Sequence, residues 1–75
     1  MILIEFEVRK EKGGWVSRRT DARRASVVAA TQHEVVAATR GIAERAGGGR
    51  ISIFGRDGIL RQSYVVQPEQ RRLAA

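Results

Sequence analysis

The chain has 75 residues, no cysteine, one histidine, and 14 basic against 8 acidic side chains, for a formal net charge of +6. A chain of this length forms a single domain. The lack of cysteine excludes a disulfide framework, a thiolate zinc site and a thiol nucleophile, and a lone histidine excludes multi-histidine metal cages. We therefore expect a non-enzymatic domain with no cofactor and no metal, whose charge points to an anionic partner.

The apolar start of the chain does not predict a targeting or membrane segment. Glu5 and Glu7 interrupt it at once, so it lacks the pattern of a signal peptide. No apolar run reaches the roughly 18 to 20 residues that span a bilayer. We expect a cytoplasmic protein that makes no use of a membrane.

Residues 2–9 are predicted to form a half-buried strand, because Ile4, Phe6 and Val8 alternate with charged side chains. The two glycines that end residues 10–14 permit the positive φ of a hairpin reversal. The return strand is then expected over residues 15–20.

Trp15, at the start of that return strand, is predicted to anchor the core or the hairpin, because aromatic side chains carry much of the buried area of a small core. Residues 21–26 are expected to form a loop. The loop leads to a brief extended piece at Val27 and Val28.

A helix is predicted to begin at Gln32, because Thr31 and Glu34 have the spacing of a capping box. His33 is then an exposed residue of the first turn. The apolar stripe of this helix consists of Val35, Val36, Thr39, Ile42, Ala43 and Ala46. The glycine run over residues 47–49 ends the helix.

A second hairpin is predicted from the strand at residues 50–54 and the Asp57-Gly58 turn pair. If the loop between the two strands has an even number of residues, alternate side chains of the hairpin point toward the core and the others point outward. The expected core group is Ile51, Ile53, Leu60 and Tyr64. The expected outer group is Arg50, Ser52, Phe54, Ile59, Arg61, Ser63 and Val65.

The fold class is therefore α+β, with the order strand, strand, helix, strand, strand, an antiparallel sheet and one helix packed on one face. The domain is expected to span residues 1–67. Residues 68–75 are expected to form a basic C-terminal tail, with a helical turn starting at Pro68 as the alternative.

From Trp15 onward the chain contains several short motifs, one after another. They are Arg24-Ala25-Ser26, the Thr31–Glu34 helix start, the Gly47-Gly48 helix exit, the Gly55-Arg56-Asp57-Gly58-Ile59-Leu60-Arg61 hairpin and Ser63-Tyr64. In these motifs the chain resembles a family of small bacterial proteins known as domain of unknown function 2188. The resemblance implies a compact cytosolic α+β domain and no established activity.

Two groups of arginines are candidate binding residues. The first consists of Arg18, Arg19, Arg23 and Arg24, at the end of the second strand and in the following loop, where their side chains can converge on phosphates. The second consists of Arg50, Arg56 and Arg61, which flank Phe54 on the second hairpin, as in base-stacking sheets. Because Glu5 and Glu7 share its face and repel phosphates, we prefer the first group, although an arginine-rich composition from GC-rich coding sequence explains both.

The alternative function is a homodimeric interaction module, of a phage or accessory kind, without a nucleic-acid role. Its candidate interface consists of Phe54, Ile59, Val65, Arg50 and Arg61 on the sheet face that one helix leaves uncovered. In a two-fold dimer, Glu5 or Glu7 of one copy meets Arg50 or Arg61 of the other. No nucleophile, acid/base pair or metal set is apparent in the pattern.

Overall fold

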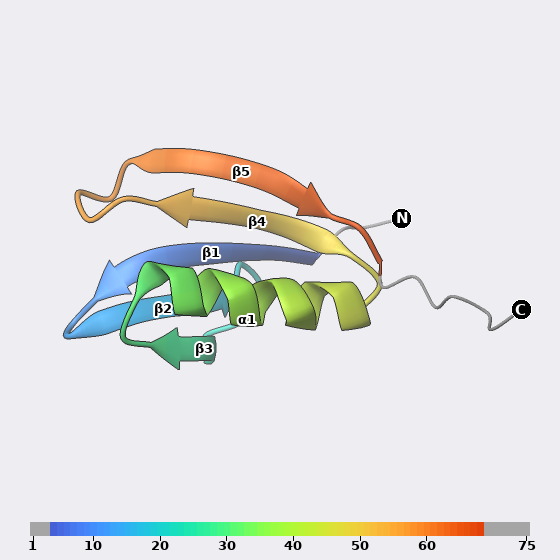
Figure 1. The fold of residues 1–75 in the computed structure, drawn as a ribbon, viewed down its shortest axis with the longest axis horizontal. Coiled ribbons are helices and arrows are strands. Elements are labelled where there is room, and N and C mark those ends of the chain that lie inside the picture. Colours follow the sequence, from blue (N-terminus) through green and yellow to red (C-terminus); the bar gives the residue numbers. More distant parts are fainter. Residues whose placement is uncertain (1–3, 69–75) are drawn as a thin grey trace, which may run out of the picture.

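A computed structural model describes residues 4–68 of the chain. It contains five strands and one helix, listed here in chain order: β1 (Ile4–Glu11), β2 (Gly14–Arg19), β3 (Ala25–Ala29), α1 (Gln32–Arg45), β4 (Gly49–Phe54) and β5 (Leu60–Val66). The strands form one sheet in the order β3-β2-β1-β4-β5. Figure 1 shows α1 lying across one face of this sheet. The α+β class is confirmed, and the predicted tail over residues 68–75 lies outside the described residues except for Pro68.

The sheet is mixed, not antiparallel as predicted, and it contains one strand more than expected. Ala25–Ala29 forms a full strand, β3, that pairs antiparallel with β2. Only Val27 and Val28 give a clear strand signal in the sequence, where they are predicted to be a brief extended piece, whereas Ala25 and Ser26 give a weak one. Because this additional strand reverses the direction in which the chain enters α1, β4 runs parallel to β1.

The helix begins and ends where the sequence predicts. The Thr31 hydroxyl oxygen accepts the backbone N–H of Glu34 at 3.2 Å, and the hydroxyl group donates to the Glu34 carboxylate at 2.9 Å. The helix stops before Gly47 and Gly48, whose φ values of 98° and 99° favour glycine.

The core lies between α1 and the sheet, as the strand alternation predicts. Its buried members are Phe6, Val8, Trp15, Val35, Ala43, Ile51, Ile53 and Val66. Trp15 is thus confirmed as a core residue. The predicted helix stripe holds except at Ala46, which caps the helix and is exposed.

The predicted core position of Leu60 is wrong, because the hairpin loop is odd in length. The N–H of Gly55 donates to the Ile59 carbonyl at 2.9 Å, which leaves a three-residue turn that ends on Gly58 at φ 80°. The pairing also shifts between Ile53 and Phe54. Leu60 is consequently paired with Phe54 and is 52% exposed.

No helix among the described residues is long and apolar enough to cross a membrane.

Candidate nucleic-acid interface

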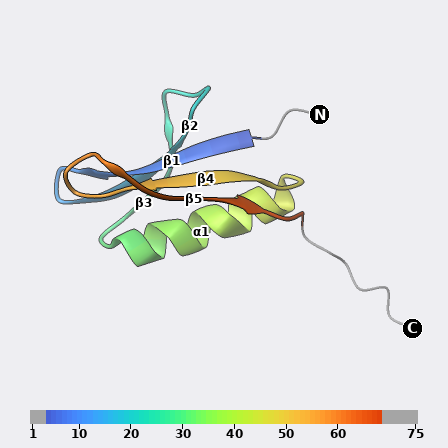
Figure 2. The same cartoon turned by 90° about the horizontal axis from the view of Figure 1, so that it is seen from above.

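The arginines at the end of β2 and in the β2–β3 connection form a distinct structural unit. We call residues 18–24 the arginine loop. The antiparallel pairing of β2 with β3 shifts between Ser17 and Arg18. Figure 2 shows that the connection beyond this irregularity rises from the sheet on the side opposite α1. The loop therefore projects away from the domain.

Arg18 braces the loop from the outer face of the sheet, which is the face opposite α1. It lies across from Glu7 in the β1–β2 register. Its Nε donates to the backbone carbonyl of Arg23 at 3.0 Å, and its Nη1 contacts the Glu11 carboxylate at 3.0 Å. One guanidinium thus ties the loop backbone to β1.

Arg19 points to the opposite side of the sheet, because it lies across from the core residue Phe6. Its guanidinium makes a bidentate contact with Asp21, with both N–O distances at 2.9 Å. These hydrogen bonds lower the pKa of Asp21 and raise the pKa of Arg19 above its usual value. The N–H of Ala22 also donates to the Arg19 carbonyl at 3.1 Å, so this pair closes the turn.

Arg23 and Arg24 occupy the projecting part of the loop, and both are exposed. Within residues 4–68, neither guanidinium takes part in an ion pair. The structure therefore does not bring the four arginines to one point. Two of them hold the loop through acceptors of the protein itself, and two are presented to solvent.

Sequence reasoning missed the acidic partners of these arginines. Asp21 follows Arg19 by two residues, and this spacing is a usable signal. Glu11 is seven residues before Arg18, and only the β1–β2 register brings the two side chains together.

In the second arginine group, around Phe54, one arginine forms an ion pair and another reaches a hydroxyl group. Arg61 contacts Asp57 at 2.6 Å, and Arg50 reaches the Ser63 hydroxyl at 3.5 Å. The guanidinium that lies over the Phe54 ring, 3.7 Å from its centroid, belongs to Arg9. Sequence reasoning did not assign Arg9 to this group, although the alternation of β1 places it on the outer face.

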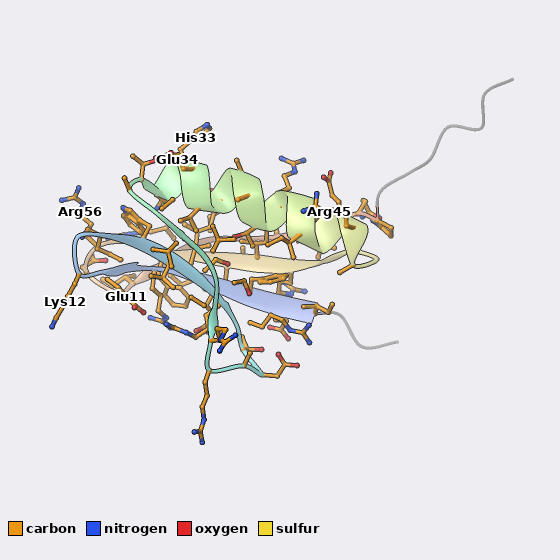
Figure 3. All side chains as sticks on the ribbon, turned by 90° about the horizontal axis from the view of Figure 1, so that it is seen from below. Glu11, Lys12, His33, Glu34, Arg45 and Arg56 are labelled. Carbon is orange, nitrogen blue, oxygen red and sulfur yellow. The ribbon has the colours of Figure 1, made fainter. Side chains whose placement is uncertain are left out.

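A pocket of about 370 Å³ lies along α1 and is lined by His33, Val36, Ala37, Arg40, Gly41 and Glu44. His33 is exposed, as predicted, and Figure 3 shows it pointing away from the sheet. The carboxylate of the pocket, Glu44, lies three helical turns from His33, about 16 Å at 1.5 Å per residue. The described part of the chain contains no group of three His, Cys, Asp or Glu side chains that could hold a metal ion.

We compared the chain with known proteins and with models of protein families, and a family model matches. No curated protein and no solved structure matches the chain significantly. A family model described as "Uncharacterized protein conserved in bacteria (DUF2188)" matches residues 6–66, which include the helix and every strand except the first two residues of β1. The chain therefore belongs to this family of uncharacterised bacterial proteins, as the order of its motifs indicated.

Proposed function

We propose that this chain is a small, non-enzymatic binding module that contacts the phosphate backbone of nucleic acid through its arginine loop. The observation that supports the proposal is the division of the four arginines. Arg18 and Arg19 fix the shape of the loop, and Arg23 and Arg24 remain exposed on it. A braced loop whose two exposed cations have no ion-pair partner among residues 4–68 loses little conformational entropy when it meets an anion.

The charge around the loop favours such a contact. Two acidic groups near the loop, Asp21 and Glu11, are already neutralised by Arg19 and Arg18. They therefore repel a phosphate only weakly. Phosphate contacts carry no sequence information, so we expect binding with little sequence preference.

The proposal is tested by fluorescence anisotropy with labelled duplex DNA, single-stranded DNA and RNA. Binding is expected at about 50 mM salt and should weaken strongly by about 200 mM. The loop variant R23Q/R24Q should bind at least about tenfold more weakly, since each lost charged contact costs on the order of 1 kcal/mol or more.

A matched control removes the same charge elsewhere. Arg45 and Arg56 are exposed, and Figure 3 shows them at opposite ends of the molecule, on α1 and on the β4–β5 turn. R45Q/R56Q should therefore bind nearly as well as the wild type. If both double variants lose the same affinity for nucleic acid, the effect is one of net charge and not of the arginine loop. If the wild type does not bind nucleic acid at low salt, the proposal is refuted.

A further inference from the structure

The outer face of the sheet is covered by no described element, because α1 lies on the other face (Figures 1 and 2). Large apolar side chains are exposed on it. Val28 on β3 is 69% exposed, and Leu60 and Val65 on β5 are 52% and 43% exposed. An uncovered sheet face of this kind is typical of a surface that packs against another protein.

A row of three apolar side chains and one arginine crosses this face at one level. Val16 on β2, which is only 8% exposed, is the register partner of Arg9 on β1, and Phe54 on β4 is the register partner of the exposed Leu60 on β5. The Arg9 guanidinium lies over the Phe54 ring and joins the two halves. We call these four side chains the outer row.

The charges of this face are paired within the chain at three places. Arg9 contacts Glu7 at 3.3 Å, and two further pairs are Arg18 with Glu11 and Arg61 with Asp57. Glu5 and Arg50 are register partners on β1 and β4, yet neither takes part in an ion pair within residues 4–68. One acidic and one basic side chain thus remain available to a partner.

We propose that this face binds a second copy of the chain, about a two-fold axis that runs parallel to the strands between β1 and β4. Rotation about this axis places β1 of one copy over β4 of the other. Glu5 then faces Arg50 of the second copy, twice per dimer. The outer row of one copy contacts the outer row of the other, with Arg9 over Phe54 and Val16 over Leu60 of the second copy. The contact is therefore self-complementary and closed.

The strand order leaves room for the arginine loop in this dimer. Two strands, β2 and β3, lie on one side of the axis beyond β1, whereas only β5 lies beyond β4. β3 therefore lies outside the sheet of the second copy, and the raised loop, which joins β2 to β3, lies at the edge of that sheet. The overlap of four short strands is at the small end of specific interfaces, below about 1,200 Å² in total, so we expect a concentration-dependent dimer.

Charge reversal in two separate variants tests the pairing in trans. E5R alone and R50E alone should each weaken dimerisation at least tenfold, measured by sedimentation equilibrium without nucleic acid, because each places like charges opposite one another. A mixture of the two variants should form a heterodimer, since every acidic side chain again faces a basic one. Contacts within one chain cannot produce this recovery.

A second pair of variants tests the position of the axis. L60K should prevent dimerisation, whereas V28K, which alters a more exposed side chain on the same face, should not, because β3 lies outside the contact. Circular dichroism confirms that each variant is folded. A wild-type chain that stays monomeric up to millimolar concentration, a mixture that forms no heterodimer, or equal effects of L60K and V28K would overturn the proposal.

If the wild type forms no dimer and L60K loses nucleic-acid binding, the outer face binds nucleic acid. This result would also overturn the proposed dimer. Dimerisation is measured as the mass of the protein in the absence of nucleic acid. A failure of the dimer proposal can therefore be distinguished from a failure of the proposed nucleic-acid binding.

Discussion

Two buried hydroxyl groups are expected to affect stability in opposite directions. Ser17 on β2 and Thr39 on α1 are both fully buried. The Thr39 hydroxyl donates to the Val35 carbonyl at 2.7 Å, whereas the Ser17 hydroxyl has no hydrogen-bond partner among the described residues. An unpaired buried hydroxyl costs about 1–3 kcal/mol, so Ser17→Ala should stabilise the fold.

The size of the effect follows from two opposing contributions. Removal of one oxygen leaves a void that costs only a few tenths of a kcal/mol, at about 24 cal/mol per Å³. The net gain for Ser17→Ala is then about 1 kcal/mol, which raises the melting temperature by about 4–8 °C for a domain of this size. The isosteric change Thr39→Val should instead lose about 1 kcal/mol, because it removes a satisfied hydrogen bond.

Urea unfolding followed by the fluorescence of Trp15 measures both changes, since this is the single tryptophan and it is buried in the core. The slope against urea should stay constant, which shows that only stability has changed. If Ser17→Ala destabilises the protein by more than about 0.5 kcal/mol, the Ser17 hydroxyl is satisfied and the reasoning is wrong.

Two further predictions concern glycine and pH. Gly41→Ala should stabilise α1 by about 0.5–1 kcal/mol, because the new Cβ would meet only the end of the flexible Arg45 side chain, at 3.3 Å. Gly49→Ala should destabilise the sheet, since its Cβ would lie 2.8 Å from the Ile4 carbonyl oxygen; similar urea midpoints for both variants would contradict this. The pKa of Asp57 is lowered from 3.8, first by the Ile59 N–H and then by Arg61, so its stabilisation is present above that pH and is lost as the pH falls through the lower folded value. In Asp57→Asn the melting temperature should therefore fall less steeply as the pH is lowered through the acid range. An unchanged fall would refute the contribution of Asp57 to stability.

Much of the fold could be predicted because its signals are local. The capping residues Thr31 and Glu34 fixed the helix start, and the alternation of Phe6 and Val8 fixed the buried face of β1. The third strand could not be predicted with the same ease, because Ala25 and Ser26 pack little apolar surface and acquire strand structure only by pairing with β2. The parallel pairing of β1 with β4 depends on that strand and was missed with it.

The side-chain contacts of the candidate site depend on non-local register. Parity correctly assigns Arg18 and Arg19 to opposite faces once β2 is known, but it does not reveal that Glu11 binds Arg18. The exposure of Leu60 has a similar origin, since it follows from a turn of odd length around Gly58 and not from any property of leucine. Local sequence therefore indicates which side chains carry charge, and tertiary pairing decides which of them remain available.

The salt dependence of nucleic-acid binding tests the assignment of Arg23 and Arg24 most directly. Each phosphate contact on duplex DNA contributes about 0.9 to the slope of log K against log salt concentration. R23Q/R24Q should therefore lower the magnitude of the wild-type slope by about 1.8, and R45Q/R56Q should leave it nearly unchanged. Equal slopes for the wild type and R23Q/R24Q would show that the arginine loop does not contact phosphates.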